Sequence, residues 1–304
     1  ADLPPFVRLN VPDDTSIGTF GSEALLELRS TWTPPNSPGG RSFAAGSLLA
    51  APLADVLNSD WQRVTPLFEP SADGSNSLQG MSHTRNHIVL ETSEHVRSEL
   101  RFWKYAGAGA WQPLSRAEGA GAAPVGQTVS VSAVWPDDSD QLWLHRAGFL
   151  TPPTLEIASA ADLCSSPTPL KMMPAHFDAS GIECTQHFAT SADGTRVPYF
   201  LIGRADLPLD GSNVTLIDGY GGFEISMGPY YSGSVGAAWL SRGGVKCIAN
   251  IRGGGEYGPA WHQGALREKR PRAYEDFEAV ARDLIERRVT SVPRLGAIGG
   301  SNGG

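Results

Sequence analysis

The sequence contains no long apolar run. A helix that crosses a bilayer needs about 20 consecutive, mainly apolar residues, and no stretch of the 304-residue chain approaches that length. The first ten residues, ADLPPFVRLN, also lack the basic segment and apolar core of a secretory signal peptide. We therefore expect no membrane partner and a cytoplasmic location, or a periplasmic one if a signal peptide preceded these residues.

Cysteine is scarce. The three cysteines, Cys164, Cys184 and Cys247, lie far apart and show no C-x-x-C spacing. This arrangement indicates neither a disulfide framework nor a zinc site. We interpret all three as small apolar core residues in a reducing compartment.

An excess of basic residues is also missing, because 24 Lys and Arg face 32 Asp and Glu, for a formal net charge of −8. Nucleic acids are bound by clustered Lys and Arg, so we expect no nucleic-acid partner. His83, His87 and His95 are close in sequence, but they fit no compact ligand spacing and no Cys or carboxylate completes a set. We interpret them as solvated or strand-packed and expect a monomer without metal or cofactor.

The first 175 residues are rich in short segments with strand character, separated by turn clusters such as PPNSPGG and EPSADGSNS. The candidate strands are residues 24–32, 42–51, 87–92, 100–105, 129–134, 141–147 and 155–158. Many short strands at this spacing predict an all-β propeller, barrel or sandwich. Because no strict repeat can be aligned, an irregular β-sandwich remains the alternative to a propeller.

The pattern changes near residue 180. Residues 185–190 and 197–202 flank an Asp-Gly turn, which is a strong hairpin signal. Beyond it, apolar strands alternate with helices, and this alternation predicts a parallel sheet. The expected strands are residues 214–217, 245–251 and 295–298, and the expected helices are residues 230–242 and 272–288. We therefore predict two domains, residues 1–178 and 179–304, with the boundary between residues 177 and 183.

The last ten residues, LGAIGGSNGG, take a short apolar strand into a glycine cluster centred on Ser301. The pattern G-x-S-x-G is that of a nucleophile elbow, a sharp strand-to-helix turn that exposes the serine oxygen. Glycine is needed on both sides because the backbone segments approach closely. In isolation the same pattern also fits a glycine-rich loop with an idle serine.

Four blocks of sequence occur in a fixed order. They are DGYGGF at 218–223, ANIRGGGEYG at 249–258 with Trp261-His262, YEDF at 274–277 and GGSNGG at 299–304. Together they resemble the prolyl oligopeptidase family of serine peptidases in order and spacing. The resemblance extends more loosely back to about Phe149, and the region before that is similar to the family's seven-bladed propeller only in general character. The fold that it implies is a partial all-β propeller followed by a partial α/β-hydrolase domain.

The resemblance implies a role for each matching site residue. Ser301 corresponds to the nucleophile, and the backbone N–H of Asn302 corresponds to one oxyanion donor. Tyr220 corresponds to the tyrosine whose hydroxyl is the second donor, although in isolation it would be interpreted as a packed aromatic bonded to a backbone carbonyl. Phe223 corresponds to an aromatic residue that lines the pocket for the residue before the scissile bond.

The glycine-rich block RGGGEYG is expected to be structural and close to the site. Within it, we predict that Arg252 and Glu256 form ion pairs and take no catalytic role. His262 belongs to this block and does not match the family's catalytic histidine.

In this fold the catalytic triad runs Ser, Asp, His along the chain, and the sequence ends at Gly304. The resemblance therefore implies a fragment whose parent would hydrolyse short peptides, after proline, through an acyl-enzyme at Ser301. The alternatives are a relative with another specificity, such as a basic-residue oligopeptidase, an acylaminoacyl peptidase or an esterase. From another class, a non-catalytic propeller interaction protein with a decayed hydrolase half is also compatible.

Overall fold

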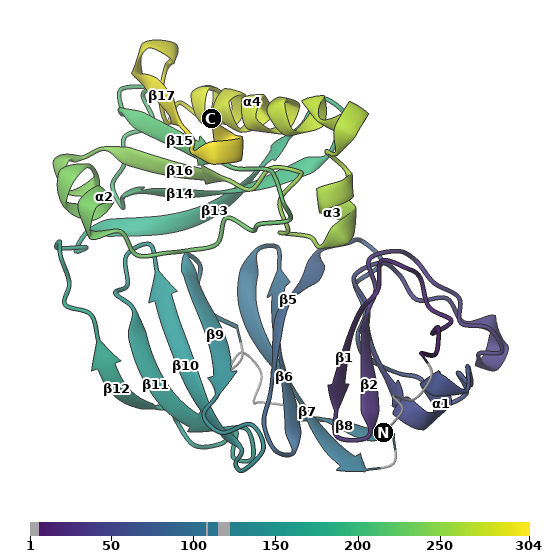
Figure 1. Cartoon of the computed structure of the whole chain (residues 1–304). Helices are drawn as coiled ribbons and strands as arrows, with labels where there is room; N and C mark the ends of the chain where they lie inside the picture. Colours follow the sequence, from purple (N-terminus) through teal and green to yellow (C-terminus); the bar gives the residue numbers. More distant parts are fainter. Residues whose placement is uncertain (1–5, 108, 115–121) are drawn as a thin grey trace.

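The structure, a computed structural model, describes residues 6–107, 109–114 and 122–304. Residues 1–5, which belong to the amino-terminal stretch without a signal-peptide pattern, lie outside this range. The chain up to residue 172 forms three four-stranded antiparallel sheets, and the remainder forms a five-stranded mixed sheet with helices (Figure 1).

Each of the three antiparallel sheets is a meander whose neighbouring strands follow one another in sequence. The first contains β1 (Ser16–Phe20), β2 (Glu23–Glu27), β3 (Leu48–Pro52) and β4 (Thr65–Phe68). The second contains β5 (Asn76–His83), β6 (His87–Glu94), β7 (Arg97–Gly107) and β8 (Ala110–Leu114). The third contains β9 (Gln127–Ala133), β10 (Gln141–Gly148), β11 (Thr154–Ser159) and β12 (Thr168–Met172). A short helix, α1 (Leu53–Leu57), and a 3₁₀ turn, η1 (Pro38–Gly40), lie within the first sheet's connections.

Neighbouring sheets share apolar cores, and strand β6 shows how. Side chains alternate between the two faces of a strand, so Ile88 and Leu90 pack with Phe20 of the first sheet. Val89 points the other way and packs with Val131 of the third sheet. The second sheet is therefore covered on both faces, and the three sheets stand side by side beneath the last sheet (Figure 1).

The last sheet has the strand order β13-β14-β16-β15-β17. Its strands are β13 (Ile182–Thr190), β14 (Arg196–Arg204), β15 (Thr215–Gly219), β16 (Val245–Ala249) and β17 (Leu295–Ile298). The helices are α2 (Gly233–Ala238), α3 (Pro259–Gln263) and α4 (Pro271–Glu286), with the 3₁₀ turns η2 (Leu240–Arg242), η3 (Arg267–Lys269), η4 (Val292–Arg294) and η5 (Ser301–Gly303). Among the helices of the described residues, none is long and apolar enough to cross a bilayer.

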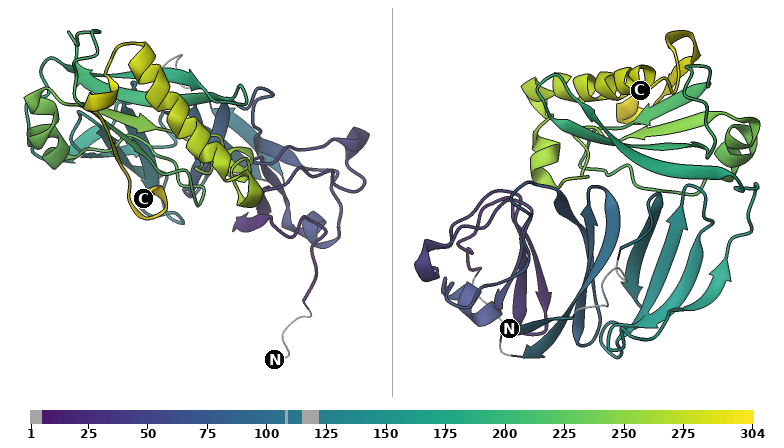
Figure 2. Two further views of the ribbon diagram at one scale, coloured as in Figure 1. Left: turned by 90° about the horizontal axis from the view of Figure 1, so that it is seen from above. Right: turned by 180° about the vertical axis from the view of Figure 1, so that it is seen from behind.

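Both faces of this sheet are covered, as the continuous apolar runs of its strands require. In β14, Tyr199 and Leu201 join one core with α4, which lies along that face of the sheet (Figure 2). Phe200 and Ile202 join a second core on the opposite face, together with Leu240 of η2.

The parallel pairing predicted for the strands that follow the hairpin is confirmed, and the sheet as a whole is mixed. Strand β15 pairs in parallel with β16 and β17, but β14 is antiparallel to both β13 and β16. The Asp193-Gly194 turn accounts for the antiparallel pairing of β13 with β14, because consecutive strands joined by a tight turn can only run antiparallel. The helix expected at residues 230–242 is also shorter, because it is confined to α2 and η2 and interrupted at Trp239, whose φ of −121° is not helical.

The interpretation of all three cysteines as core residues is wrong for one of them. Cys247 is buried in β16 and Cys184 is partly buried, but Cys164 is exposed in the loop between β11 and β12. That loop contains no strand that could carry the thiol into a core.

Candidate active site

The turn that follows β17 places Ser301 at its exposed tip. Ser301 has φ of +52°, the left-handed conformation that a non-glycine residue rarely adopts, and it begins the 3₁₀ turn η5. A Cβ at Gly299 would collide with the carbonyl oxygen of Gly303, so this position has to be glycine. Within the described residues, the Ser301 hydroxyl makes no hydrogen bond. The geometry is that expected from the G-x-S-x-G pattern.

The elbow contacts the loop that follows β15. The side-chain amide of Asn302 donates a hydrogen bond of 2.7 Å to the backbone carbonyl of Tyr220. Gly222 lies directly against this amide, where a Cβ would clash with it. The structure therefore brings Ser301, Asn302 and Tyr220 together, and the side-chain bond of Asn302 is a contact that sequence reasoning did not identify.

The segment 220–224 is strained. Phe223 and Glu224 have φ of +52° and +57°, and consecutive non-glycine residues in this region cost free energy that neighbouring contacts must offset. The N–H of Glu224 points at the carbonyl of Gly253 at 3.2 Å and at Nδ1 of His262 at 3.2 Å. Arg270 donates to the carbonyl of Gly221. The strained segment is thus held by the glycine-rich block that follows β16 and by Arg270.

Phe223 is 73% exposed, and its ring centroid lies 6.5 Å from that of Tyr220. A residue that forms a wall for a ligand has to be accessible in this way, whereas a core aromatic is not. Phe223 also lines a cavity between the last sheet and the first two sheets.

Arg252 forms the ion pairs predicted for it. The buried guanidinium donates to both carboxylate oxygens of Asp276 at 2.9 and 2.7 Å. It also donates to Asp193, at 2.6 Å, in the turn between β13 and β14. The hydrogen bond from Arg252 holds the pKa of Asp193 well below its usual range. Two of the four sequence blocks and the Asp193-Gly194 turn are therefore joined by one guanidinium, which is a structural role.

The ion pair predicted for Glu256 is wrong. Glu256 is 1% exposed, and among the described residues no cation pairs with its carboxyl group. Oε1 accepts from the N–H of Met227 at 2.9 Å and from Nδ2 of Asn250 at 3.2 Å. Desolvation raises the pKa of Glu256 to about 7, against the effect of these hydrogen bonds. The only sequence signal for this environment was a single acidic residue inside a run of glycines.

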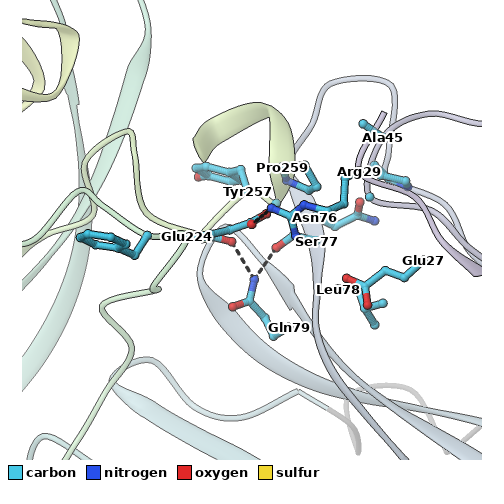
Figure 3. Close-up of a pocket in the computed structure, with 15 residues that line it drawn as sticks. Glu27, Arg29, Ala45, Asn76, Ser77, Leu78, Gln79, Glu224, Tyr257 and Pro259 are labelled. Atoms are coloured by element: carbon cyan, nitrogen blue, oxygen red, sulfur yellow. Dashed lines mark hydrogen bonds and ion pairs between the residues drawn. The ribbon is translucent and has the colours of Figure 1, made fainter. Parts of the chain in front are cut away.

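The cavity beside Phe223 has a volume of about 320 Å³ and is shown in Figure 3. Across it, Arg29 from the loop after β2 forms an ion pair with Glu224. Gln79 of β5 donates to Ser77 at 2.7 Å and to the carbonyl of Gly255 at 3.0 Å. Glu27 also lines the cavity, and desolvation raises the pKa of its carboxyl group against the opposing effect of Arg29.

The three neighbouring histidines of the second sheet have separate partners. His87 pairs through Nδ1 with Asp140 at 2.9 Å, and His95 contacts the hydroxyl of Tyr257 at 3.2 Å. His83 packs edge-on against Phe20. Within the described residues, no group of three or more His, Cys, Asp or Glu side chains is placed to hold a metal ion.

The chain is similar in sequence and in fold to known peptidases. A model of the prolyl oligopeptidase family matches residues 231–304. An uncharacterized peptidase of Sinorhizobium fredii is 43% identical over 94% of this chain and 38% of its own length. A prolyl endopeptidase of Elizabethkingia miricola is 35% identical over 54% of this chain and 23% of its own length.

Among solved structures, a post-proline cleaving enzyme from Rickettsia typhi superposes with a TM-score of 0.82 at 30% identity. The match covers 98% of this chain and 41% of that one. These matches show that the chain is similar to the prolyl oligopeptidase family. It spans about two fifths of the length of the Sinorhizobium fredii and Rickettsia typhi proteins.

Proposed function

We propose that this chain carries the nucleophile and oxyanion site of a serine peptidase that cleaves short peptides after proline. The observation that carries the proposal is the exposed, left-handed Ser301 at the end of β17, joined through Asn302 to the Tyr220 segment. The relatives named prolyl endopeptidase and post-proline cleaving enzyme support the specificity.

In the proposed reaction, the Ser301 oxygen attacks the carbonyl carbon of the scissile bond while a general base takes its proton. The C–N bond then breaks, the leaving amine takes that proton, and water hydrolyses the resulting ester. Within the described residues no hydrogen bond joins a base to Ser301. The proposal therefore requires a base outside the contacts that the structure describes.

Negative charge on the tetrahedral intermediate requires preorganised donors. We assign them to the Tyr220 hydroxyl and the Asn302 backbone N–H. The bond between the Asn302 side chain and the Tyr220 carbonyl supports this assignment because it ties the two donors to one framework. The exposed ring of Phe223 is assigned to the wall that contacts the proline of the substrate.

The three antiparallel sheets are proposed to be part of a β-propeller, residues 1–178, and the mixed sheet to be part of an α/β-hydrolase domain, residues 179–304. The change of sheet between β12 and β13 supports this boundary. In this arrangement the propeller limits access to short peptides. We further propose a cytoplasmic monomer whose partners are peptides, without nucleic acid or membrane.

The test uses the protein expressed from its complete reading frame. A fluorophosphonate probe is expected to label the protein and to fail on Ser301→Ala, because only an activated serine reacts. Chromogenic dipeptides with proline, arginine or alanine before the reporter then test specificity, and proline is expected to give the highest kcat/KM. Equal labelling of Ser301→Ala would exclude Ser301 as the nucleophile, and a preference for arginine or alanine would exclude the proline specificity.

A further inference from the structure

Glu256 lies where three segments meet. Its carboxyl group accepts from the N–H of Met227, in the segment that follows Phe223, and from the side chain of Asn250, directly after β16. Its backbone carbonyl accepts from the hydroxyl of Ser77 in β5 at 2.8 Å. One residue thus contacts the Phe223 segment, the end of β16 and the second sheet.

Two oxygen atoms in this arrangement have no donor. Glu256 and Asn250 are 1% and 0% exposed, and neither Oε2 of Glu256 nor Oδ1 of Asn250 has a hydrogen-bond partner among the described residues. An ionised carboxylate has only acceptors, so it leaves both oxygens unsatisfied and a charge buried without a cation. A proton on Glu256 supplies the missing donor. The bond from Asn250 Nδ2 to Glu256 Oε1 already places the amide and the carboxyl group side by side.

We propose that Glu256 is a positioning residue that carries a proton on Oε2 and donates it to the side-chain oxygen of Asn250. The resulting acid–amide pair, with the bond from Met227, fixes the Phe223 segment against the loop after β16. The consequence for substrate rests on the proposed function, because it uses Phe223 as the pocket wall. The protonation and the loop contact do not depend on that function.

The titratable groups around Glu256 have other partners. Tyr257, the next residue, contacts Nδ1 of His95 through its hydroxyl, and Glu224 is paired with Arg29. His262 faces the carbonyl of Gly253 through Nδ1 at 2.7 Å. Desolvation is the main cause that raises the pKa of Glu256 to about 7, and the hydrogen bonds from Met227 and Asn250 act against it.

The direction of the pH effect follows from this raised pKa. The folded state binds the proton more tightly than the unfolded chain, whose ordinary value is 4.5. The contribution of Glu256 is therefore fully present below that value and is lost as the pH rises through about 7. Glutamine keeps a neutral group with a donor at every pH, so Glu256→Gln removes this dependence.

The experiment follows hydrogen exchange of residues 222–229 in the 304-residue chain, corrected for the intrinsic rate at each pH. Between about pH 4.5 and about pH 7, opening in the wild type is expected to rise by up to about tenfold for each pH unit, and above about pH 7 it is expected to level off. Glu256→Gln is expected to stay protected throughout, and Glu256→Ala to be open at every pH. A wild type without a pH step, or a Gln variant as open as the Ala variant, would overturn the proposal.

Glu91→Gln is the matched control. Burial also raises the pKa of Glu91, which accepts from the N–H of Val131 at 2.7 Å in a different part of the molecule. This variant is expected to keep the wild-type pH step in residues 222–229. Loss of the pH step in this control would overturn the assignment to Glu256.

In the protein from the complete reading frame, KM for the proline substrate should rise across the same pH range in the wild type but not in Glu256→Gln. The exchange measurement needs no turnover. It therefore tests the role of Glu256 even if the proposed peptidase function is wrong.

Discussion

The side chain of Asn302 donates a 2.7 Å hydrogen bond to the backbone carbonyl of Tyr220, 82 residues earlier in the chain. The bond joins the turn that carries Ser301 to the strained loop that carries Phe223. Both segments contain non-glycine residues with positive φ, and such conformations persist only where contacts over-determine them. This hydrogen bond is one of those contacts.

Asn302→Ala is expected to lower kcat by about fivefold, because the loss of one hydrogen bond is worth about 1 kcal/mol and the misplaced segment holds the proposed oxyanion donors. The measurement is steady-state kinetics on a proline substrate in the protein from the complete reading frame. Ser291→Ala is the control, since its hydroxyl also donates to a backbone carbonyl, that of Gly211 at 2.8 Å, away from the elbow. Equal kcat in Asn302→Ala and the control would contradict this role.

Local patterns in the sequence predicted the elbow and the hairpin because their causes are local. Glycine at 299 and the Asp-Gly turn are required by the backbone of the residues that contain them. Strands β1, β4, β5, β8 and β12 were missed. Two of them have no buried apolar face: β5 has the mainly polar sequence NSLQGMSH, and every residue of β12 is exposed. Their pairing comes from neighbouring strands, which a single segment cannot reveal.

In the site, residue types were predictable and long-range partners were not. An ion pair was expected for Arg252, but nothing in the sequence indicated that Asp193, 59 residues away, would share it. An ion pair was also expected for Glu256, but it does not form, because a carboxyl group forms an ion pair only where the fold supplies a cation. Here the fold supplies an amide from Asn250 and a backbone N–H from Met227.

Arg252→Lys is expected to lower the free energy of unfolding by about 1.5 to 3 kcal/mol, the usual range for hydrogen bonds to a charged group, because the positive charge is kept but part of the hydrogen bonding is lost. Lysine cannot reproduce the bidentate contact with Asp276 and the bond to Asp193 together. Urea denaturation is the measurement. Arg282→Lys is the control, because its pair with Glu278 is exposed to solvent and contributes little. A stability of Arg252→Lys close to that of the control would show that the buried pair is not stabilising.

Asp140→Asn tests the contact between the second and third sheets. The carboxylate of Asp140, just before β10, accepts from Thr84, from Asn86 and from His87 of β6. Desolvation opposes ionisation, but these hydrogen bonds outweigh it and hold the pKa of Asp140 well below its usual range. Its stabilisation is therefore present above about pH 4 and is lost as the pH falls through the lowered pKa.

We expect Asp140→Asn to lose about 1.5 to 3 kcal/mol at neutral pH, the usual range for hydrogen bonds to a charged group. The difference from the wild type should shrink as the solution is acidified below about pH 4. Asp138→Asn, two residues earlier and exposed, serves as the control and should show no such trend. If the urea midpoints of Asp140→Asn and the wild type differed by the same amount at neutral and at acid pH, the charge of Asp140 would not contribute to stability.

The final prediction separates catalysis from packing at Tyr220. If its hydroxyl donates to the oxyanion, Tyr220→Phe keeps the ring but removes a donor aimed at charge that develops only in the transition state. We expect kcat to fall by roughly 10² to 10³ while KM changes little. A tyrosine that only packs would leave kcat within about threefold and lower stability by about 1 kcal/mol. Steady-state kinetics on a proline-containing chromogenic peptide, with melting curves alongside and Tyr274→Phe as an exposed control, decides between the two. An unchanged kcat in Tyr220→Phe would exclude the oxyanion role, and the Ser301→Ala result would still stand on its own.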